Sequence, residues 1–170
     1  MPTRSRAAFA AILLLTFVCL LFRAENAPAS PAGDEAAVKQ VVANFEKAFD
    51  SHDVHAVSQL FVEDADFTNI QGATTHSRKE LEEHLGPLFS TRLKTVNTAT
   101  AVRTVRFLTP DVAVVDSDFT FTGFKGPDGA DLPARKGFYD WIVTRQNGRW
   151  LIAVFHESYL PDAPAPAPGH

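Results

Sequence analysis

Cysteine is almost absent from this sequence: the 170 residues include one, Cys19. It lies inside an apolar run near the N-terminus, so the chain beyond that run has no thiol. This absence excludes disulfide bonds, thiolate catalysis and cysteine-ligated zinc or iron–sulfur sites from the rest of the chain. A fold without these cross-links must be stabilised by its own packed core.

An excess of positive charge is also missing, with 16 Lys and Arg against 20 Asp and Glu and a formal net charge of −4. A mildly acidic chain with scattered basic residues is a poor nucleic-acid binder, so no nucleic acid is expected as a partner. There is no glycine-rich dinucleotide fingerprint, and we expect no cofactor. His52 and His55 have metal-ligand spacing, but no third ligand lies near them, so no dedicated metal site is predicted.

One long hydrophobic run is present, at residues 7–22, after Arg4 and Arg6. Small residues follow it, among them Ala27-Pro28-Ala29. A basic start, a short apolar centre and small residues after it predict a secretory signal at residues 1–29 and a periplasmic or secreted protein. The alternative is an uncleaved membrane anchor, although the run is shorter than the roughly 20 apolar residues that a spanning helix needs.

The remaining chain reads as one domain. Residues 30–33 are interpreted as a linker, and the Pro/Ala-rich residues 161–170 as an extended tail that cannot pack. Between them, residues 34–160 are long enough for a single domain. Across the whole chain 45% of residues are hydrophobic and 14 are Phe, which is enough for a core.

Three helices are predicted before most of the strands. Apolar residues recur at three- and four-residue spacing from Val38 to Phe49, and Val57, Leu60 and Phe61 suggest the inner face of a short second helix. Ser77 and Glu80 form a capping box that starts a third helix. Pro87 is expected to bend or shorten that helix.

The strand pattern has a period of two. One strand is predicted early and four more follow, the last two joined by Asn147-Gly148, a strong hairpin signal. The predicted strands are residues 64–70, 96–107, 112–124, 135–145 and 150–159. Segregated helices and strands predict an α+β fold, in which a curved antiparallel sheet wraps over three N-terminal helices.

This order of elements resembles the nuclear transport factor 2-like superfamily, and its SnoaL-like and SgcJ/EcaC branch most closely. The motifs that carry the resemblance are Phe49-Asp50-Ser51-His52-Asp53, residues 60–67, Gly72 before the third helix, Asn147-Gly148-Arg149-Trp150 and the ending His156-Glu157-Ser158. The last is also similar to the close of the calcium/calmodulin-dependent protein kinase association domain.

The resemblance implies a cone with an apolar pocket at its wide end, and frequent homodimers through the outer sheet face. It does not imply one reaction, because members include isomerases, dehydratases, hydrolases, cyclases and pure binding domains. The proton-shuttling carboxylate of a steroid-isomerase-like member falls near Asn69, and its helix tyrosine near Phe45. Neither residue here can do that chemistry, so the isomerase activity is not expected.

Candidate site residues follow from strand alternation and from family position. Tyr139 and Trp141 share one strand face and are expected inside the cone. His156 is the strongest single candidate, because histidine exchanges protons near neutrality. Asp66 is a possible base on the first predicted strand. The other residues expected at the pocket are Asn69, Phe119, His76 and Arg78, the last two at a helix N-terminus that favours anions.

Three functions stay open from the sequence. The first is binding of a small hydrophobic or amphipathic molecule in the cone. The second is a SnoaL-like enzyme (an isomerase, cyclase, dehydratase or hydrolase) that uses His156 with Asp66 or Tyr139 for proton transfer. The third is a dimeric assembly domain whose cone is filled by side chains.

Overall fold

The structure, a computed structural model, describes residues 31–160. The compact unit that holds the core and the pocket begins at Glu35. The predicted signal segment with Cys19 and the predicted tail at residues 161–170 lie outside the described residues. Within residues 31–160, no helix is both long and apolar enough to cross a membrane.

Three helices are described: α2 (Pro31–Asp50), α3 (Val54–Ser58) and α4 (Arg78–Ser90). α2 begins inside the segment expected to be a linker at residues 30–33. Proline is favoured at the first position of a helix, where its missing N–H would have no partner, so Pro31 starts the helix instead of preventing it.

The side chain of Ser77 caps α4 by accepting a hydrogen bond from the Glu80 amide at 3.2 Å. The Glu80 carboxylate reaches back to the His76 amide at 2.8 Å, one residue before the predicted partner. Pro87 was expected to bend or shorten this helix, but α4 continues through it to Ser90. The preceding residue, Gly86, has no Cβ to clash with the proline ring, which reduces the usual penalty.

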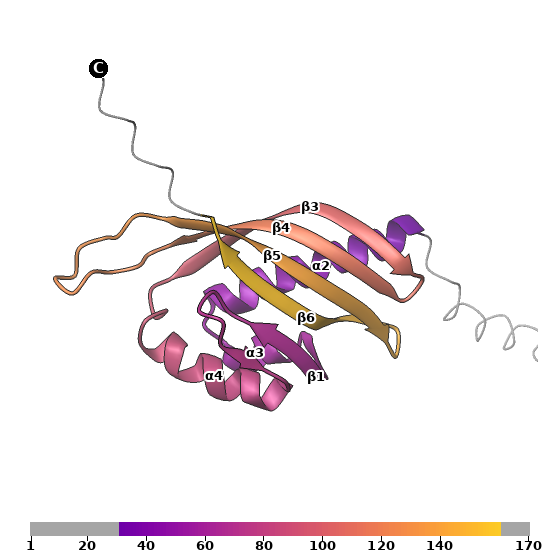
Figure 1. The fold of residues 1–170 in the computed structure, drawn as a ribbon, viewed down its shortest axis with the longest axis horizontal. Coiled ribbons are helices and arrows are strands. Elements are labelled where there is room, and N and C mark those ends of the chain that lie inside the picture. The colour runs from indigo at the N-terminus through magenta and orange to yellow at the C-terminus, as the bar shows by residue number, and fades with distance from the viewer. Residues whose placement is uncertain (1–30, 161–170) are drawn as a thin grey trace, which may run out of the picture. The chain divides into compact units, whose positions relative to one another are not determined.

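Six strands form one sheet with the order β2-β1-β6-β5-β4-β3 (Figure 1). Their bounds are β1 (Phe61–Thr68), β2 (Thr74–Thr75), β3 (Asn97–Thr109), β4 (Val112–Thr122), β5 (Arg135–Gln146) and β6 (Arg149–Tyr159). The predicted α+β class and antiparallel meander are confirmed for β3 to β6. β1 differs, because it joins the edge of the meander parallel to β6 and starts at Phe61, which was assigned to the second helix.

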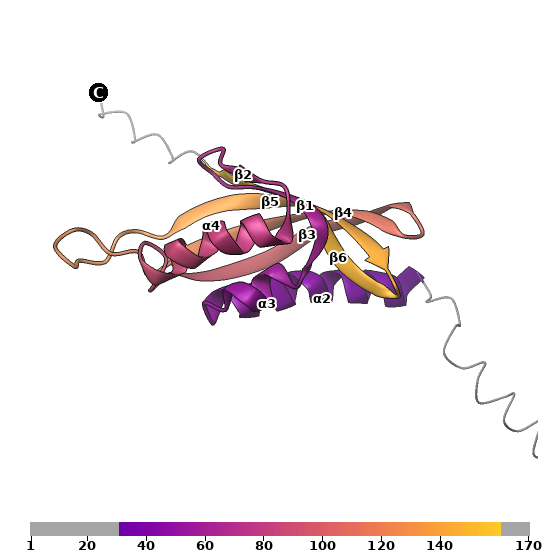
Figure 2. The ribbon, with the colours of Figure 1, turned by 90° about the horizontal axis from the view of Figure 1, so that it is seen from below.

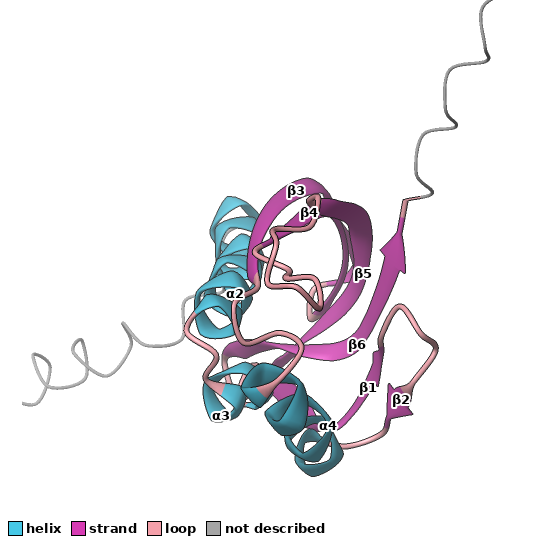
Figure 3. Ribbon diagram, turned by 90° about the vertical axis from the view of Figure 1, so that its left-hand side faces the viewer, coloured by secondary structure: helices cyan, strands magenta, loops and turns pink. Residues whose placement is uncertain are grey.

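The sheet is strongly curved, and the helices lie on its concave side (Figures 2 and 3). Phe45 of α2 is the centre of the core. Its ring lies 5.1 Å from Trp141 and 5.3 Å from Phe155, measured between ring centroids. Close edge-to-face and tilted ring pairs of this kind add to the free energy of apolar burial. The aromatic residues of the sequence therefore hold the sheet on α2.

An irregularity in the β5–β6 pairing decides which side chains of β6 face the core. The register shifts between Ile142 and Val143, and on β6 both Ile152 and Phe155 are buried although Phe155 is the third residue after Ile152. An even spacing would be needed for two residues of a regular strand to share a face. The bulge thus places Phe155 and Glu157 on the concave side, and His156 on the convex side.

Candidate functional site

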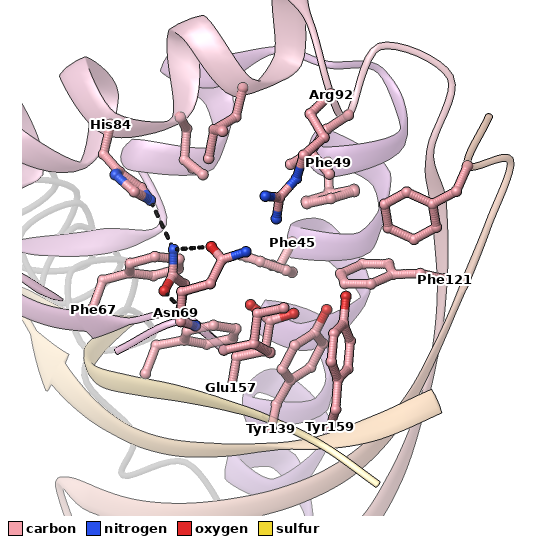
Figure 4. Close-up of a pocket in the computed structure, with 17 residues that line it drawn as sticks. Phe45, Phe49, Phe67, Asn69, His84, Arg92, Phe121, Tyr139, Glu157 and Tyr159 are labelled. Carbon is pink, nitrogen blue, oxygen red and sulfur yellow. Dashed lines mark hydrogen bonds between the residues drawn. The ribbon is translucent and has the colours of Figure 1, made fainter. Parts of the chain in front are cut away.

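A pocket lies between the concave face of the sheet and α4, and its walls are mainly aromatic (Figure 4). Its cavity volume is about 50 Å³, and the whole hollow, with the open solvent at its mouth included, measures about 550 Å³. A cavity of this size has room for a few water molecules. The aromatic lining residues are Phe45, Phe49, Phe67, Phe121, Phe124, Tyr139, Phe155 and Tyr159.

Asn69, just after β1, organises the polar side of the pocket. Its Oδ1 accepts hydrogen bonds from the backbone N–H groups of Gln71 at 2.9 Å and Ala73 at 3.0 Å. These two bonds fix the orientation of the amide, because only its oxygen can accept. The amide nitrogen then faces His84 Nε2 at 3.2 Å. Asn69 therefore has a clear role in holding a second pocket residue in place.

His84 comes from the inner face of α4, one turn after Leu81 and next to Leu85. The Asn69 amide nitrogen can only donate, so His84 Nε2 is the acceptor in this contact. The imidazole also lies 6.0 Å from the Phe67 ring, measured between centroids. The pocket thus contains an oriented histidine, contributed by a helix instead of by the last strand.

Arg92 follows α4 and extends its guanidinium over the cavity (Figure 4). Gln71 lies beside it. When the Gln71 amide is turned over, its oxygen accepts hydrogen bonds from both terminal guanidinium nitrogens, at 2.7 and 3.0 Å. Arg92 is exposed while most of the wall is buried, so this pair forms the rim of the pocket.

Glu157 of β6 is the carboxyl group of the pocket. Burial raises its pKa from 4.5 to about 7, although a hydrogen bond with the backbone at Ile70 and the positive charge of Arg92 act in the opposite direction. Desolvation penalises the charged form of a carboxyl group, which explains the direction. Near neutral pH this group both gives and takes protons.

Two tyrosines stand beside Glu157, and the oxygen tips of all three side chains point into the cavity (Figure 4). Burial raises the pKa of Tyr139 well above its ordinary value, and the charge of Glu157 adds to the effect. The phenol is therefore a hydrogen-bond donor at physiological pH. Tyr159 supplies a second hydroxyl group from the end of β6.

The expectation that His156 faces the pocket is wrong. This residue is exposed on the convex face of β6, opposite Asp140 of β5, which is exposed as well. The bulge in β6 shifts the alternation, and a shift of one residue moves every following side chain to the other face. Glu157 occupies the inward position that His156 was expected to have.

Asp66, His76 and Arg78 also lie outside the pocket. Asp66 points outward from β1 and accepts a hydrogen bond from His76 Nδ1 at 2.7 Å, which raises the pKa of that histidine. Arg78 donates to the carbonyl oxygen of Phe61 at 2.6 Å and lies 3.4 Å from Glu63. These residues tie the start of α4 to β1 and cannot reach a ligand in the cavity.

Two further candidates lie on the concave side but behind the lining. Trp141 is fully buried, and its Nε1 donates to Ser117 Oγ at 2.8 Å. The Phe119 ring stacks on Tyr139 with 4.3 Å between centroids. Of the residues predicted for the site, Tyr139 and Asn69 thus line the pocket directly, and Trp141 and Phe119 support Tyr139.

Sequence reasoning missed His84, Arg92 and Glu157. His84 had a readable signal, because it shares the apolar stripe of α4 with Leu81 and Leu88. Glu157 required knowledge of the bulge, and Arg92 lies in a turn with no periodic pattern. Within residues 31–160, no group of three or more His, Asp or Glu residues is arranged to hold a metal ion.

Solved structures with the same fold come from several bacteria. A cystatin-like domain of unknown function from Nostoc punctiforme is 19% identical, with a TM-score of 0.69 over 78% of this chain and 80% of that one. An NTF-2-like protein of unknown function from Shewanella oneidensis is 16% identical, with a TM-score of 0.63 over 74% and 98%. A ketosteroid isomerase-like protein from Erwinia carotovora is 19% identical, with a TM-score of 0.62 over 74% and 95%. These likenesses show the fold alone.

No curated protein matched the sequence. Residues 31–156 match the family described as SnoaL-like domain, which covers most of the chain and nearly all of its described part. The chain therefore belongs to the SnoaL-like domain family of the nuclear transport factor 2-like superfamily.

Proposed function

We propose that this protein binds a small hydrophobic or amphipathic molecule in the pocket between the sheet and α4. The observation that carries the proposal is the composition of the lining, which combines eight aromatic and four aliphatic side chains with a polar group of five, namely Asn69, Gln71, His84, Arg92 and Glu157. Apolar walls with a few convergent polar groups are typical of small-molecule sites. The limited space favours a molecule with a single ring.

The proposal is tested by filling the pocket. Leu88 lines it from α4 and is half-buried. We expect Leu88→Trp to abolish the binding of single-ring aromatic compounds such as benzyl alcohol and benzoate, measured by isothermal titration calorimetry on the full chain. Leu108→Trp, at an exposed position of β3, makes the same change outside the pocket and should bind as the wild type does. No binding by the wild-type protein, or equal binding by both variants, would overturn the proposal.

A second candidate function is proton-transfer catalysis within the same pocket, with Glu157 in the role first expected for His156. Its support is the raised pKa of Glu157, about 7, together with the oriented His84 across the cavity. A general base works best when its pKa lies near the working pH. Carboxyl and imidazole groups that converge on one cavity are typical of enzymes that move a proton to or from carbon.

This second candidate has a test that needs no known substrate. Acetophenone has one ring and exchangeable protons beside its carbonyl group. We expect the wild-type protein to accelerate their exchange for deuterium in D₂O, followed by NMR, and Glu157→Gln to lose the acceleration. Asp66→Asn, on the outer side of β1, is the matched control and should keep it. If acetophenone exchanges no faster with the wild-type protein than in buffer alone, this second candidate is wrong and binding stays the proposed function.

A further inference from the structure

We propose that the pocket selects ligands with an anionic oxygen, such as an aromatic carboxylate, over neutral or cationic ligands of the same shape. This inference rests on the proposed binding function and names the class of ligand. It follows from the balance of hydrogen-bond donors and acceptors that the lining offers and from its charge.

The polar side chains of the lining offer mostly donors. Arg92 can only donate and has more N–H groups than the two that bond Gln71, and the hydroxyl groups of Tyr139 and Tyr159 point into the cavity, where they can donate (Figure 4). The main acceptor, Asn69 Oδ1, already receives two backbone hydrogen bonds. A ligand that brings acceptors, and few donors, therefore leaves the fewest polar groups unpaired.

The charge of the lining favours the same ligand. Arg92 is the one permanent cation and Glu157 the one carboxyl group among the described lining residues. Figure 4 shows the Arg92 guanidinium on the α4 side of the cavity, opposite the oxygen tips of Glu157 and the two tyrosines. A planar carboxylate between these two sides meets a guanidinium that suits bidentate pairing, and hydroxyl groups that can donate to its second oxygen.

Protonation of Glu157 controls this preference. The groups that face Glu157 are Arg92 after α4, His84 on α4, Tyr139 on β5 and Tyr159 on β6, with Asp50 of α2 acting on Tyr139 through space. While Glu157 holds its proton, the lining has a net positive charge and a further donor. Once Glu157 ionises above about pH 7, its negative charge repels an anionic ligand. Binding of the anion should therefore take up a proton at alkaline pH.

The test uses three probes of one shape: benzoate, benzamide and benzylamine. Each is titrated into the full chain by calorimetry at pH 6, 7, 8 and 9. At pH 6 we expect benzoate to bind about tenfold more tightly than benzamide, and benzylamine to bind least. Well above pH 7, the affinity for benzoate should fall about tenfold per pH unit, as expected for one linked proton.

Three variants separate the contributions. Arg92→Gln should remove the preference for benzoate over benzamide, whereas Arg106→Gln, an exposed arginine of β3 outside the pocket, should keep it. Glu157→Gln should keep the preference and lose its dependence on pH. Arg92→Lys should restore part of the preference and so distinguishes lost charge from altered folding.

The outcomes also separate this inference from the proposed function. If benzamide or benzylamine binds as well as benzoate, the pocket binds ligands but the selection for anions is wrong. If the preference for benzoate survives in Arg92→Gln, it has another source and the inference is equally wrong. If none of the three probes binds, the proposed binding function itself fails.

Discussion

Glu157 shows how one side chain couples the stability of the protein to its pocket. A carboxyl group aimed into an aromatic cavity is costly once it ionises, and the raised pKa reflects that cost. The group would be more stable in water, so its position lowers the free energy of unfolding at neutral and alkaline pH. Side chains held in such unfavourable positions are common at functional sites.

The first prediction concerns the dependence of stability on pH. The unfolded chain releases the Glu157 proton near pH 4.5 and the folded chain near pH 7, so between these values the folded state holds more protons. The free energy of unfolding should therefore fall as the pH rises through this window, by on the order of 3 kcal/mol from this group. Glu157→Gln should remove this part of the slope and be the more stable protein at pH 8.

Urea denaturation at pH 5, 6, 7 and 8 measures this slope. Glu83→Gln is the matched control, because Glu83 is exposed on α4 and pairs with Lys79 at 3.6 Å on the surface. An exposed pair of this kind contributes little to stability. Parallel curves for the wild type and Glu157→Gln would show that the group is not strained in the folded state.

At the scale of single elements, the start of α4 and the bulge in β6 build the pocket. α4 carries His84, Leu85 and Leu88, so the angle at which this helix begins decides where these side chains lie. The start is fixed by the Ser77 cap and by the Glu80 carboxylate. The bulge acts on the opposite wall, where it turns Glu157 inward.

The second prediction tests the cap. Ser77→Ala removes the oxygen that accepts from the Glu80 amide and should lower the free energy of unfolding by about 1 kcal/mol. Ser77→Asp keeps an acceptor and adds a favourable charge at the helix N-terminus, so it should equal or exceed the wild type. Urea denaturation of both variants decides the question, and equal losses in the two would mean that the cap oxygen is not what matters.

At the scale of the whole molecule, one aromatic network joins α2, the sheet and the pocket. Phe45 contacts five other rings, on α2, β1, β5 and β6. Three of them, Phe49, Tyr139 and Phe155, also line the pocket. The binding surface is thus the outer layer of the core and not a separate structure.

The third prediction follows from this continuity. Phe45→Ala should lower the free energy of unfolding by about 3–5 kcal/mol, because the cavity it leaves lies among fixed rings. Phe107→Ala, at a half-buried ring of β3 that packs against Trp150, should cost clearly less. Denaturant midpoints of the two variants give the comparison, and similar losses would contradict a core centred on Phe45.

Export stays a prediction from residues 1–29, and homodimer formation stays a prediction from the family resemblance.

Periodicity predicted most of the fold because it depends on local chemistry. The apolar stripe from Val38 to Phe49, the capping box at Ser77 and the hairpin at Asn147-Gly148 all produced the expected elements. The boundaries that differed have local reasons as well: Pro31 favours a helix start, and Gly86 tolerates the following proline. The parallel addition of β1 to β6 was not predictable in this way, because it joins segments far apart in the sequence.

The sequence by itself determined the α+β class, the family and the order of the three helices and the five longer strands, and strand alternation placed Tyr139 and Trp141 on one face of β5. Only the tertiary structure decided the pocket chemistry. A single bulge turns Glu157, instead of His156, toward the pocket. The packing of α4 over the sheet brings His84 and Arg92 to the cavity. The physical reason is that strand alternation carries no record of where a register shifts, whereas the burial of Phe155 in the aromatic core requires that shift.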